Sequence, residues 1–563
     1  MKTPRQGTNQ MENPKSENNP YLFPIVLGLF GFAFFLRIVE APTIPFTRAD
    51  ADLAWQALQI SKLNASGTSP IALYTGLTGF IFWISSANNF FARIIPALFG
   101  ASITLMPYAI IKQKNPKAIL VLSLLFALDP ILLIYSRQLN GPIMAISSIA
   151  WFVIFLYQRK QVGAGLAFGI ALLSGKYFWI GIILAGMYLL TLYLSDKQSF
   201  REKFDNFERP GSQFFISALL SSGLISSSIL LNPAGLTGIA SGLVDLFTAS
   251  SNRSIPLVLP VFILLTYSLY LILPFIKALT QKSTLTWQYR LGFFVALILL
   301  SMAFQNRLPD FYAFVVAFLL LECASYITTY KAVRTPITLV SLAAFVFFAV
   351  ILVFTLLSFN QFARKILAEF NFLIDILPIF LALALILISY ILIGLGWGFS
   401  QTKPALEAAF MIVFGLFSLG FSFSQSWNNA TASQLLFSNS EILYPDSPII
   451  NELKVFIENN AINPDTDMYK VEQPISVGDY WEFKAFTDSG YTSSLPAFII
   501  NNNISEPGLM AAYRGTSITY ARRINFSDDA YAELIHWIAT RTLPVSDIKK
   551  TLWVATSLFP GGK

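Results

Sequence analysis

The feature that most limits the possible folds of this chain is a series of long apolar segments separated by short connectors that carry lysine and arginine. The first segment runs from Tyr21 to Val39, and similar segments recur as far as Phe423. A helix needs about 20 apolar residues to cross the hydrocarbon core of a bilayer, and several segments reach that length. Hydrophobic residues make up 55% of the chain and charged residues 12%, with a mean hydropathy of +0.60. The sequence therefore predicts an all-α polytopic membrane protein over residues 21–424.

The charged connectors predict how the chain is oriented. Cationic connectors favour the cytoplasmic side, and on that basis the apolar segments give about 13 transmembrane helices, an odd number. Residues 1–20 are expected to be a disordered cytoplasmic tail, and the C-terminus is expected outside the cytoplasm. Residues 41–90 form the predicted first outer loop, in which the segments 51–63 and 71–85 are juxtamembrane helices. Counting 71–85 as a full span instead would place Lys112, Lys114 and Lys117 outside, against the charge rule.

The composition changes after residue 424, where polar residues dominate and the apolar runs become too short to span a membrane. Short runs such as 497–500 and 552–555 indicate strands, and residues 528–541 indicate a helix. We therefore expect residues 425–563 to form a small α+β domain outside the cytoplasm.

The charge and the scarce metal-binding residues exclude some classes of function. The net charge is +7, but the cations are spread over the connectors rather than gathered in one patch, so we expect no nucleic-acid partner. Cys323 and His536 are the single cysteine and the single histidine, which excludes a zinc site made of such residues. Any metal would have to be held by oxygen ligands.

Two carboxylates, Asp50 and Asp52, follow the first apolar segment. The preceding Thr47 fits a helix N-cap, so an acid in the first turn could simply stabilise the helix. The same carboxylates could remove a proton from a substrate. They could also bind a divalent metal, but two oxygen ligands are too few, so no cofactor is the favoured prediction.

Four later segments carry a family resemblance through their order along the chain. In this order, the segments resemble those of the GT-C superfamily of membrane glycosyltransferases. They are 88–100, 128–137, 165–176 and 307–312. The likeness is to the branch of protein O-mannosyltransferases and aminoarabinose transferases, which is glycosyltransferase family 39-like.

The resemblance implies an activity. Such an enzyme would transfer a sugar from a polyprenyl-phosphate donor to a protein or glycolipid acceptor at the outer face of a cell membrane, with inversion at the anomeric carbon. Asp50 falls on the acid position of the family's first outer loop and is the candidate base, with Asp52 second. Ala51 stands where the family usually has a paired glutamate.

Charged residues at the predicted outer ends of helices are candidates for binding the donor phosphate. Lys176 matches a lysine that relatives keep, and cations at a membrane face can bind a lipid phosphate. The alternative for any such cation is that it snorkels to the interface. The complete set of candidates is Lys176, Arg307, Arg137, Asp310 and Tyr312.

Two other functions stay open. The missing paired acid at Ala51, and the absence of an acid between Arg137 and Pro142, favour a catalytically degenerate relative that binds lipid-linked sugars or assists their assembly or translocation. A transporter is less favoured, because we find no matched pair of broken helices and expect no ionisable residue deep in a span.

Overall fold

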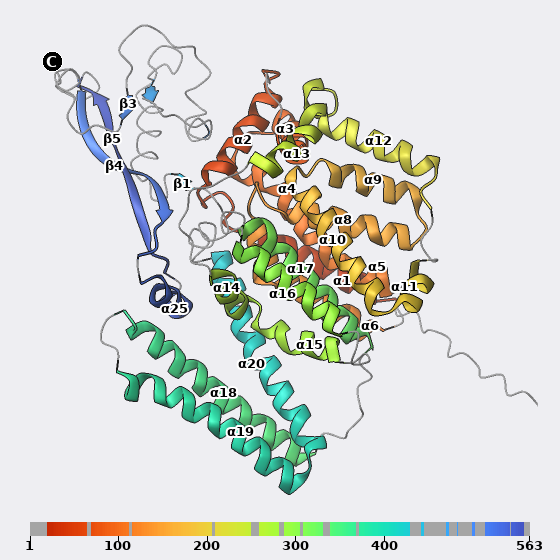
Figure 1. The fold of residues 1–563 in the computed structure, drawn as a ribbon. Coiled ribbons are helices and arrows are strands. Elements are labelled where there is room, and N and C mark those ends of the chain that lie inside the picture. The colour runs from red at the N-terminus through yellow and green to blue at the C-terminus, as the bar shows by residue number, and fades with distance from the viewer. Residues whose placement is uncertain are drawn as a thin grey trace, which may run out of the picture.

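The structure of the protein is a computed structural model. It consists mainly of helices, with a small sheet near the C-terminus (Figure 1). It describes residues 20–64, 69–111, 115–204, 209–248, 258–280, 287–303, 308–329, 338–367, 371–427, 441–443, 469–471, 481, 498–501, 513–527, 529–540 and 542–556.

The N-terminal part of the bundle contains the predicted first span and the two juxtamembrane helices at nearly the expected positions. These are α1 (Leu22–Ile38), α2 (Arg48–Ser61) and α3 (Ala72–Ile84). The helices that follow, as far as residue 248, are α4 (Asn89–Ser102), η1 (Ile103–Leu105), α5 (Met106–Ile111), α6 (Pro116–Leu128), α7 (Pro130–Tyr135), α8 (Ile143–Tyr157), α9 (Gln161–Leu172), α10 (Lys176–Ser195), α11 (Lys197–Phe204), α12 (Ser212–Ser226), η2 (Pro233–Thr237) and α13 (Gly238–Thr248).

The later helices complete the bundle and add a separate helical hairpin. Figure 1 shows α18 and α19 lying beside each other, away from the N-terminal helices. Their contact with α20 forms a second apolar core around Phe348 and Ala409. The later helices are α14 (Leu259–Tyr267), α15 (Leu269–Thr280), α16 (Trp287–Ala303), α17 (Leu308–Thr329), α18 (Leu339–Lys365), η4 (Phe372–Ile376), α19 (Leu377–Trp397) and α20 (Phe399–Trp427).

Several helices are long and apolar enough to cross a membrane. Within the described residues there are 5, from Asn89 to Ile111, α10, α18, residues 373–397 and residues 399–420. Shorter apolar helices such as α1, α6 and α8 pack among them. The protein is thus polytopic and mainly helical, and the number of 13 spans stays a prediction.

Two glycines explain how α9 and α12 pack so closely. Gly165 and Gly169 are four residues apart and therefore lie on the same face of α9. A Cβ on either glycine would overlap a serine hydroxyl of α12, at Ser217 and Ser221 respectively. Small residues at such a spacing allow helices to approach closely within a membrane.

The break between α6 and α7 shows how the bundle satisfies backbone groups that a proline releases. Pro130 has no N–H, so the carbonyl of Phe126 loses its helical partner, and Asp129 is held in an extended conformation at ψ 122°. The buried Arg37 of α1 donates to Phe126 O at 3.2 Å and to Ala127 O at 3.2 Å. An intramembrane cation here replaces missing helical hydrogen bonds.

The expectation that no ionisable residue lies deep in a span is wrong. Glu322 of α17 is fully buried and accepts a hydrogen bond from Arg290 Nε of α16 at 2.9 Å. Tyr188 of α10 also donates to Glu322. The paired charges offset each other's cost of burial and join three helices, so this cluster is a packing feature of the bundle.

The C-terminal part contains an α+β unit, which we call the outer domain after its predicted location. Its strand order is β1-β4-β5-β3-β2, with β4 and β5 forming the long antiparallel pair at the centre. The predicted strands and helix are present as β3, β5 and α25. The elements are β1 (Ile442–Leu443), β2 (Tyr469–Val471), β3 (Phe498–Asn501), β4 (Tyr513–Ile524), α25 (Ala530–Thr540) and β5 (Val545–Ala555).

Candidate functional site

The candidate base Asp50 lies in the first turn of α2, whose first residue, Arg48, donates its N–H to the carbonyl of Glu441 in the outer domain. Thr47 is the N-cap residue, and its hydroxyl accepts a hydrogen bond from the Asp50 backbone N–H at 3.2 Å. The predicted helix cap is therefore present. The cap uses the backbone of Asp50, which leaves its carboxylate available for other contacts.

The carboxylate of Asp50 is held by a second loop, between α7 and α8. Its Oδ1 accepts the backbone N–H groups of Leu139 at 2.9 Å and Asn140 at 2.8 Å. Among the described residues no donor bonds Oδ2, and the whole residue is 1% exposed. One oxygen is thus fixed, while the other remains able to accept a proton.

Burial and polar contacts act on the pKa of Asp50 in opposite directions. Removal from water raises the pKa of this carboxyl above its usual range, and the N–H of Asn140 and the positive charge of Arg93 oppose that rise. A carboxyl with a raised pKa is a stronger base toward an alcohol once it is ionised. The environment of Asp50 is therefore compatible with proton transfer.

Arg93 of α4 is a component of this site that the sequence analysis did not single out. It is fully buried and donates to the carbonyls of Ala41 at 2.6 Å and Pro45 at 3.2 Å, on the segment that leads to α2. Its guanidinium also lies over the ring of Phe46, 4.1 Å from the centroid. The available signal was a lone cation inside the apolar segment 88–100.

Arg137 is buried rather than presented to the membrane surface. It is 2% exposed, and its Nη2 donates to the carbonyls of Leu36 at 2.7 Å and Val39 at 3.0 Å, at the end of α1. Burial lowers the pKa of Arg137 to about 10. These contacts attach the loop that holds Asp50 to the first helix, which supports a structural contribution from Arg137.

Lys176 is connected to the loop that holds Asp50 through its neighbour Tyr177. It is the first residue of α10, is partly exposed, and its Nζ is 5.1 Å from the centroid of the Tyr177 ring. The hydroxyl of Tyr177 donates to the carbonyl of Asn140 at 3.0 Å. Asn140 therefore bonds Asp50 through its N–H and Tyr177 through its carbonyl, which links the start of α10 to the loop that holds Asp50.

The turn before Lys176 has a strict backbone requirement. Gly175 has a φ of 65°, a region that side chains disfavour, and a Cβ there would overlap the carbonyl oxygen of Pro70. Asp245 of α13 lies close enough to Lys176 for the lysine charge to oppose the rise that burial causes in the pKa of Asp245. Lys176 thus lies between an acidic neighbour and the loop that holds Asp50.

Two of the remaining candidates, Asp52 and Tyr312, have side chains that the structure describes. Asp52 is partly exposed on the next part of α2, and Tyr312 is buried in α17 beside Ser268. Asp310 is in α17, but its side chain lies outside the described ones, as does the whole of Arg307. Within the described residues, no group of three or more His, Cys, Asp or Glu side chains could hold a metal ion.

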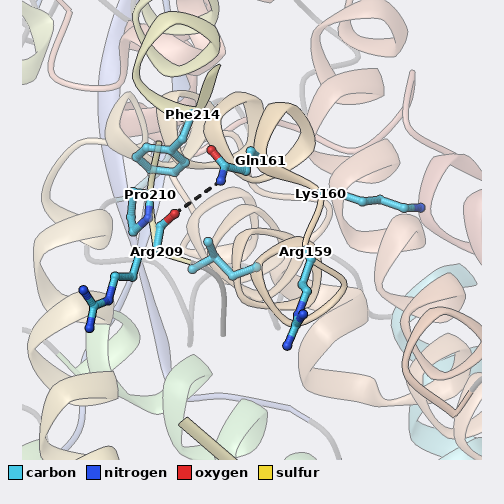
Figure 2. Close-up of a pocket in the computed structure, with 7 residues that line it drawn as sticks. Arg159, Lys160, Gln161, Arg209, Pro210 and Phe214 are labelled. Atoms are coloured by element: carbon cyan, nitrogen blue, oxygen red, sulfur yellow. Dashed lines mark hydrogen bonds between the residues drawn. The ribbon is translucent and has the colours of Figure 1, made fainter. Parts of the chain in front are cut away.

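A shallow surface pocket with no enclosed volume lies at the N-terminal end of α9 (Figure 2). It is closed by Gln161, which donates to the carbonyl of Arg209 at 3.3 Å and accepts from the N–H of Gly211 at 2.9 Å. Figure 2 shows Arg159, Lys160 and Arg209 pointing in different directions rather than toward one point. The cations of this pocket do not form a convergent anion site.

Comparison with known proteins identifies the fold. No family model matches the chain, and no curated protein matches it. The structure is similar to that of ArnT from Cupriavidus metallidurans in the apo state, with a TM-score of 0.51, 12% identity and coverage of 96% of this chain and 98% of ArnT. For ArnT bound to undecaprenyl phosphate the TM-score is 0.53, with 11% identity and coverage of 96% and 99%.

A weaker likeness exists to the oligosaccharyltransferase of Archaeoglobus fulgidus tethered with an acceptor peptide, with a TM-score of 0.34 and 13% identity over 83% of this chain and 63% of that one. A likeness this partial supports no argument about the site. The match to ArnT extends over nearly the whole of both chains, and it confirms the GT-C fold that the sequence resemblance predicted.

Proposed function

We propose that this multi-pass membrane protein with a GT-C fold is a glycosyltransferase that moves a sugar from a polyprenyl-phosphate donor to an acceptor at the outer face of the membrane. The observation that carries the proposal is the carboxylate of Asp50, which has Oδ1 fixed by two backbone N–H groups and Oδ2 bonded by no described donor. ArnT, which has the same fold, has been solved with undecaprenyl phosphate bound.

The proposed reaction is a direct displacement. Asp50 Oδ2 accepts the proton of an acceptor hydroxyl, the acceptor oxygen bonds to the anomeric carbon, and the bond from that carbon to the phosphate oxygen breaks. The electron pair of the broken bond leaves with the polyprenyl phosphate, and attack from the opposite face inverts the anomeric carbon. This displacement requires no metal ion, and the absence of a cofactor stays a prediction from the sequence.

Lys176 is the proposed partner of the leaving phosphate. It is partly exposed and linked to the Asp50 loop through Tyr177, and an ammonium stabilises negative charge that develops on a leaving group. Arg307, Asp310 and Tyr312 stay candidates for the same subsite from the sequence alone. Arg137 has its guanidinium turned to the carbonyls of α1 and contributes by holding the loop.

The acceptor is proposed to be a protein or a glycolipid outside the cytoplasm. The predicted orientation places the N-terminus in the cytoplasm and the outer domain beyond the membrane, on the side of Asp50. The outer domain contacts the segment that precedes Asp50, so an acceptor would approach the site along the boundary between the bundle and this domain.

The low exposure of Asp50 favours a second candidate function. A carboxylate that is 1% exposed and lacks the neighbouring acid of the family could belong to a degenerate relative, one that binds lipid-linked sugars without transferring them or that assists their assembly or translocation. Both candidates require binding of a polyprenyl phosphate, and only the first requires proton transfer.

The test combines binding and transfer by the purified protein. A panel of radiolabelled sugars on short-chain polyprenyl phosphates is offered to the wild type and to Asp50→Asn, with and without a chelator. Transfer by the wild type alone supports the enzyme and its base. Binding of short-chain polyprenyl phosphate without transfer of any sugar in the panel supports the second candidate, and transfer by Asp50→Asn refutes the role of Asp50.

A further inference from the structure

The segment that leads into α2 is paired with the outer domain. The N–H of Arg48 donates to the carbonyl of Glu441 at 2.7 Å, and the N–H of Leu443 donates to the carbonyl of Phe46 at 3.0 Å. Thr47 and Ile442 form the antiparallel bridge between these two bonds. Because β1 is at the edge of the five-stranded sheet, residues 46–48 pair with that edge in the manner of one short added strand.

A charged pair and a tryptophan reinforce this junction. Arg48 Nη2 lies 3.3 Å from Glu441 Oε2 on the same pair of segments. Trp481 of the outer domain is fully buried and contacts the rings of Phe82 and Phe46, at centroid distances of 5.7 and 5.6 Å. Buried aromatic contacts of this kind carry a large share of the energy of an interface.

The indole N–H of Trp481 also has a specific partner in the bundle. It donates to Asn89 Oδ1 at 2.9 Å, at the first residue of α4. The amide of Asn89 in turn donates to the carbonyl of Pro42 at 3.3 Å. Trp481 therefore contacts the segment before α2, the helix α3 and the start of α4 at one point.

These contacts converge on two of the groups that surround Asp50, namely Thr47 and Arg93. Thr47, the bridge residue, is also the N-cap that accepts the N–H of Asp50. Phe46, the residue next to it, lies under the guanidinium of Arg93, whose charge acts on Asp50. A displacement of the outer domain would therefore move the cap and this cation relative to the carboxylate.

We infer that the outer domain is a positioning element for Asp50, acting through the added strand at residues 441–443 and through Trp481. The expected effect of this positioning on the transfer rate rests on the proposed transferase function. The expected effect on the local stability of the segment around Asp50 does not. Trp481 is a positioning residue, since its contacts are with residues that hold the site.

The chain supplies a matched control at a second contact of the same domain. Trp537 of α25 lies 5.8 Å from the ring of Tyr267 in α14, and His536 Nδ1 is 3.0 Å from the carbonyl of Ala363 in α18. Trp537 is 3% exposed, so its truncation removes a buried tryptophan from the same domain at a contact that does not involve Asp50. Comparing the alanine variants of the two tryptophans distinguishes a local effect on the segment around Asp50 from a general loss of stability of the outer domain.

The first measurement is hydrogen exchange of the full-length protein, followed by mass spectrometry of peptides 45–56 and 530–540. Trp481→Ala is expected to raise the exchange rate in peptide 45–56 by about tenfold or more, because large-to-small changes in a packed site lower the energy needed for local opening. Trp537→Ala should leave that peptide unchanged and accelerate 530–540. Trp481→Phe, which keeps an aromatic ring, should restore slow exchange in 45–56.

Equal acceleration of peptide 45–56 by the two alanine variants would mean that the effect is global, and no acceleration by Trp481→Ala would mean that the site is held without the domain. Either result overturns the inference. If Trp481→Ala accelerates both peptides, a cross-link decides. Arg48→Cys with Glu441→Cys, in a Cys323→Ala background, should form a disulfide on mild oxidation and slow the exchange of peptide 45–56 in Trp481→Ala. Absence of the disulfide, or unchanged exchange after it forms, refutes the positioning contact.

The kinetic measurement tests the link to catalysis. Where the wild type transfers sugar, Trp481→Ala should lower kcat by about tenfold to a hundredfold, as expected for a misplaced catalytic group, with KM for the donor unchanged. Trp537→Ala should keep both parameters. A change confined to KM would contradict positioning of Asp50. A wild type without transfer would instead refute the proposed function, while the exchange result would still decide the structural inference.

Discussion

The contacts of Asp50 predict that two substitutions of this residue will have the same effect on transfer, whereas only one of them will lower stability. Asparagine keeps an oxygen that can accept the N–H groups of Leu139 and Asn140, which bond Asp50 Oδ1 at 2.9 and 2.8 Å. It cannot accept a proton as a base. Alanine removes both functions and leaves the buried N–H of Leu139 and the partly buried N–H of Asn140 without their acceptor.

The two effects differ in size. Loss of a general base lowers the rate by about 10² to 10⁴, which corresponds to about 3 to 5 kcal/mol of activation free energy, and this loss is expected in both variants. Each buried donor left without a partner costs about 1 to 3 kcal/mol, so Asp50→Ala should lose about that much folding free energy through the N–H of Leu139, and less through the partly buried N–H of Asn140. Asp50→Asn should unfold near the temperature of the wild type.

The chain offers a convenient reporter for the stability measurement. Cys323 is the single cysteine and is fully buried, so a thiol-specific fluorophore reacts with it only as the bundle opens. Thermal ramps of the three proteins with this dye are compared with their transfer rates. Equal stability of Asp50→Ala and Asp50→Asn would refute the role of the two N–H groups, and residual transfer by Asp50→Asn at more than about a tenth of the wild-type rate would refute the base.

Three further predictions follow from the site. Lys176→Gln should weaken binding of short-chain polyprenyl phosphate by about tenfold, measured by titration, with Lys160→Gln as a control that keeps wild-type affinity. Burial raises the pKa of Asp50, so its carboxyl group ionises at a higher pH than an ordinary aspartate. The rate of transfer should therefore rise with pH as this carboxyl group ionises. The contribution of Asp50 to folding stability should be full at low pH and should fall as the pH rises through the same pKa. A pH-rate profile with no limb above pH 4 contradicts this. Gly175→Ala should lower stability by about 1 to 3 kcal/mol through backbone strain, because its φ of 65° and ψ of −142° lie in a region that only glycine adopts readily. The variant should also weaken phosphate binding, because the overlap with Pro70 displaces Lys176. Unchanged thermal unfolding would refute the strain.

Part of the site could be predicted from local sequence. The cap at Thr47 follows from residue type and spacing, and the position of Asp50 at the start of a helix follows from the cap. The strict turn before Lys176 has a glycine as its only local signal. These features depend on contacts within a few residues, which a sequence displays directly.

The partners of the carboxylate could not be predicted in the same way. Leu139 and Asn140 bond Asp50 through backbone N–H groups, which every residue other than proline possesses, from 89 and 90 positions away. Arg137 has a side chain that can bind phosphate, yet in the structure its guanidinium donates hydrogen bonds to carbonyls at the end of α1. Side-chain chemistry alone does not state which acceptor a buried cation will meet.

The sequence by itself determined the class of the protein and the position of Asp50 at the start of a helix. Apolar segments of membrane-spanning length must form helices, because a bilayer leaves no other partner for the backbone, and the polar tail after residue 424 must lie outside them. What only the tertiary structure decided is the environment of Asp50: the loop that bonds it, the buried Arg93 beside it, and the outer domain whose Trp481 holds the preceding segment. These groups meet because helices distant in sequence pack together, and packing is a property of all the segments at once.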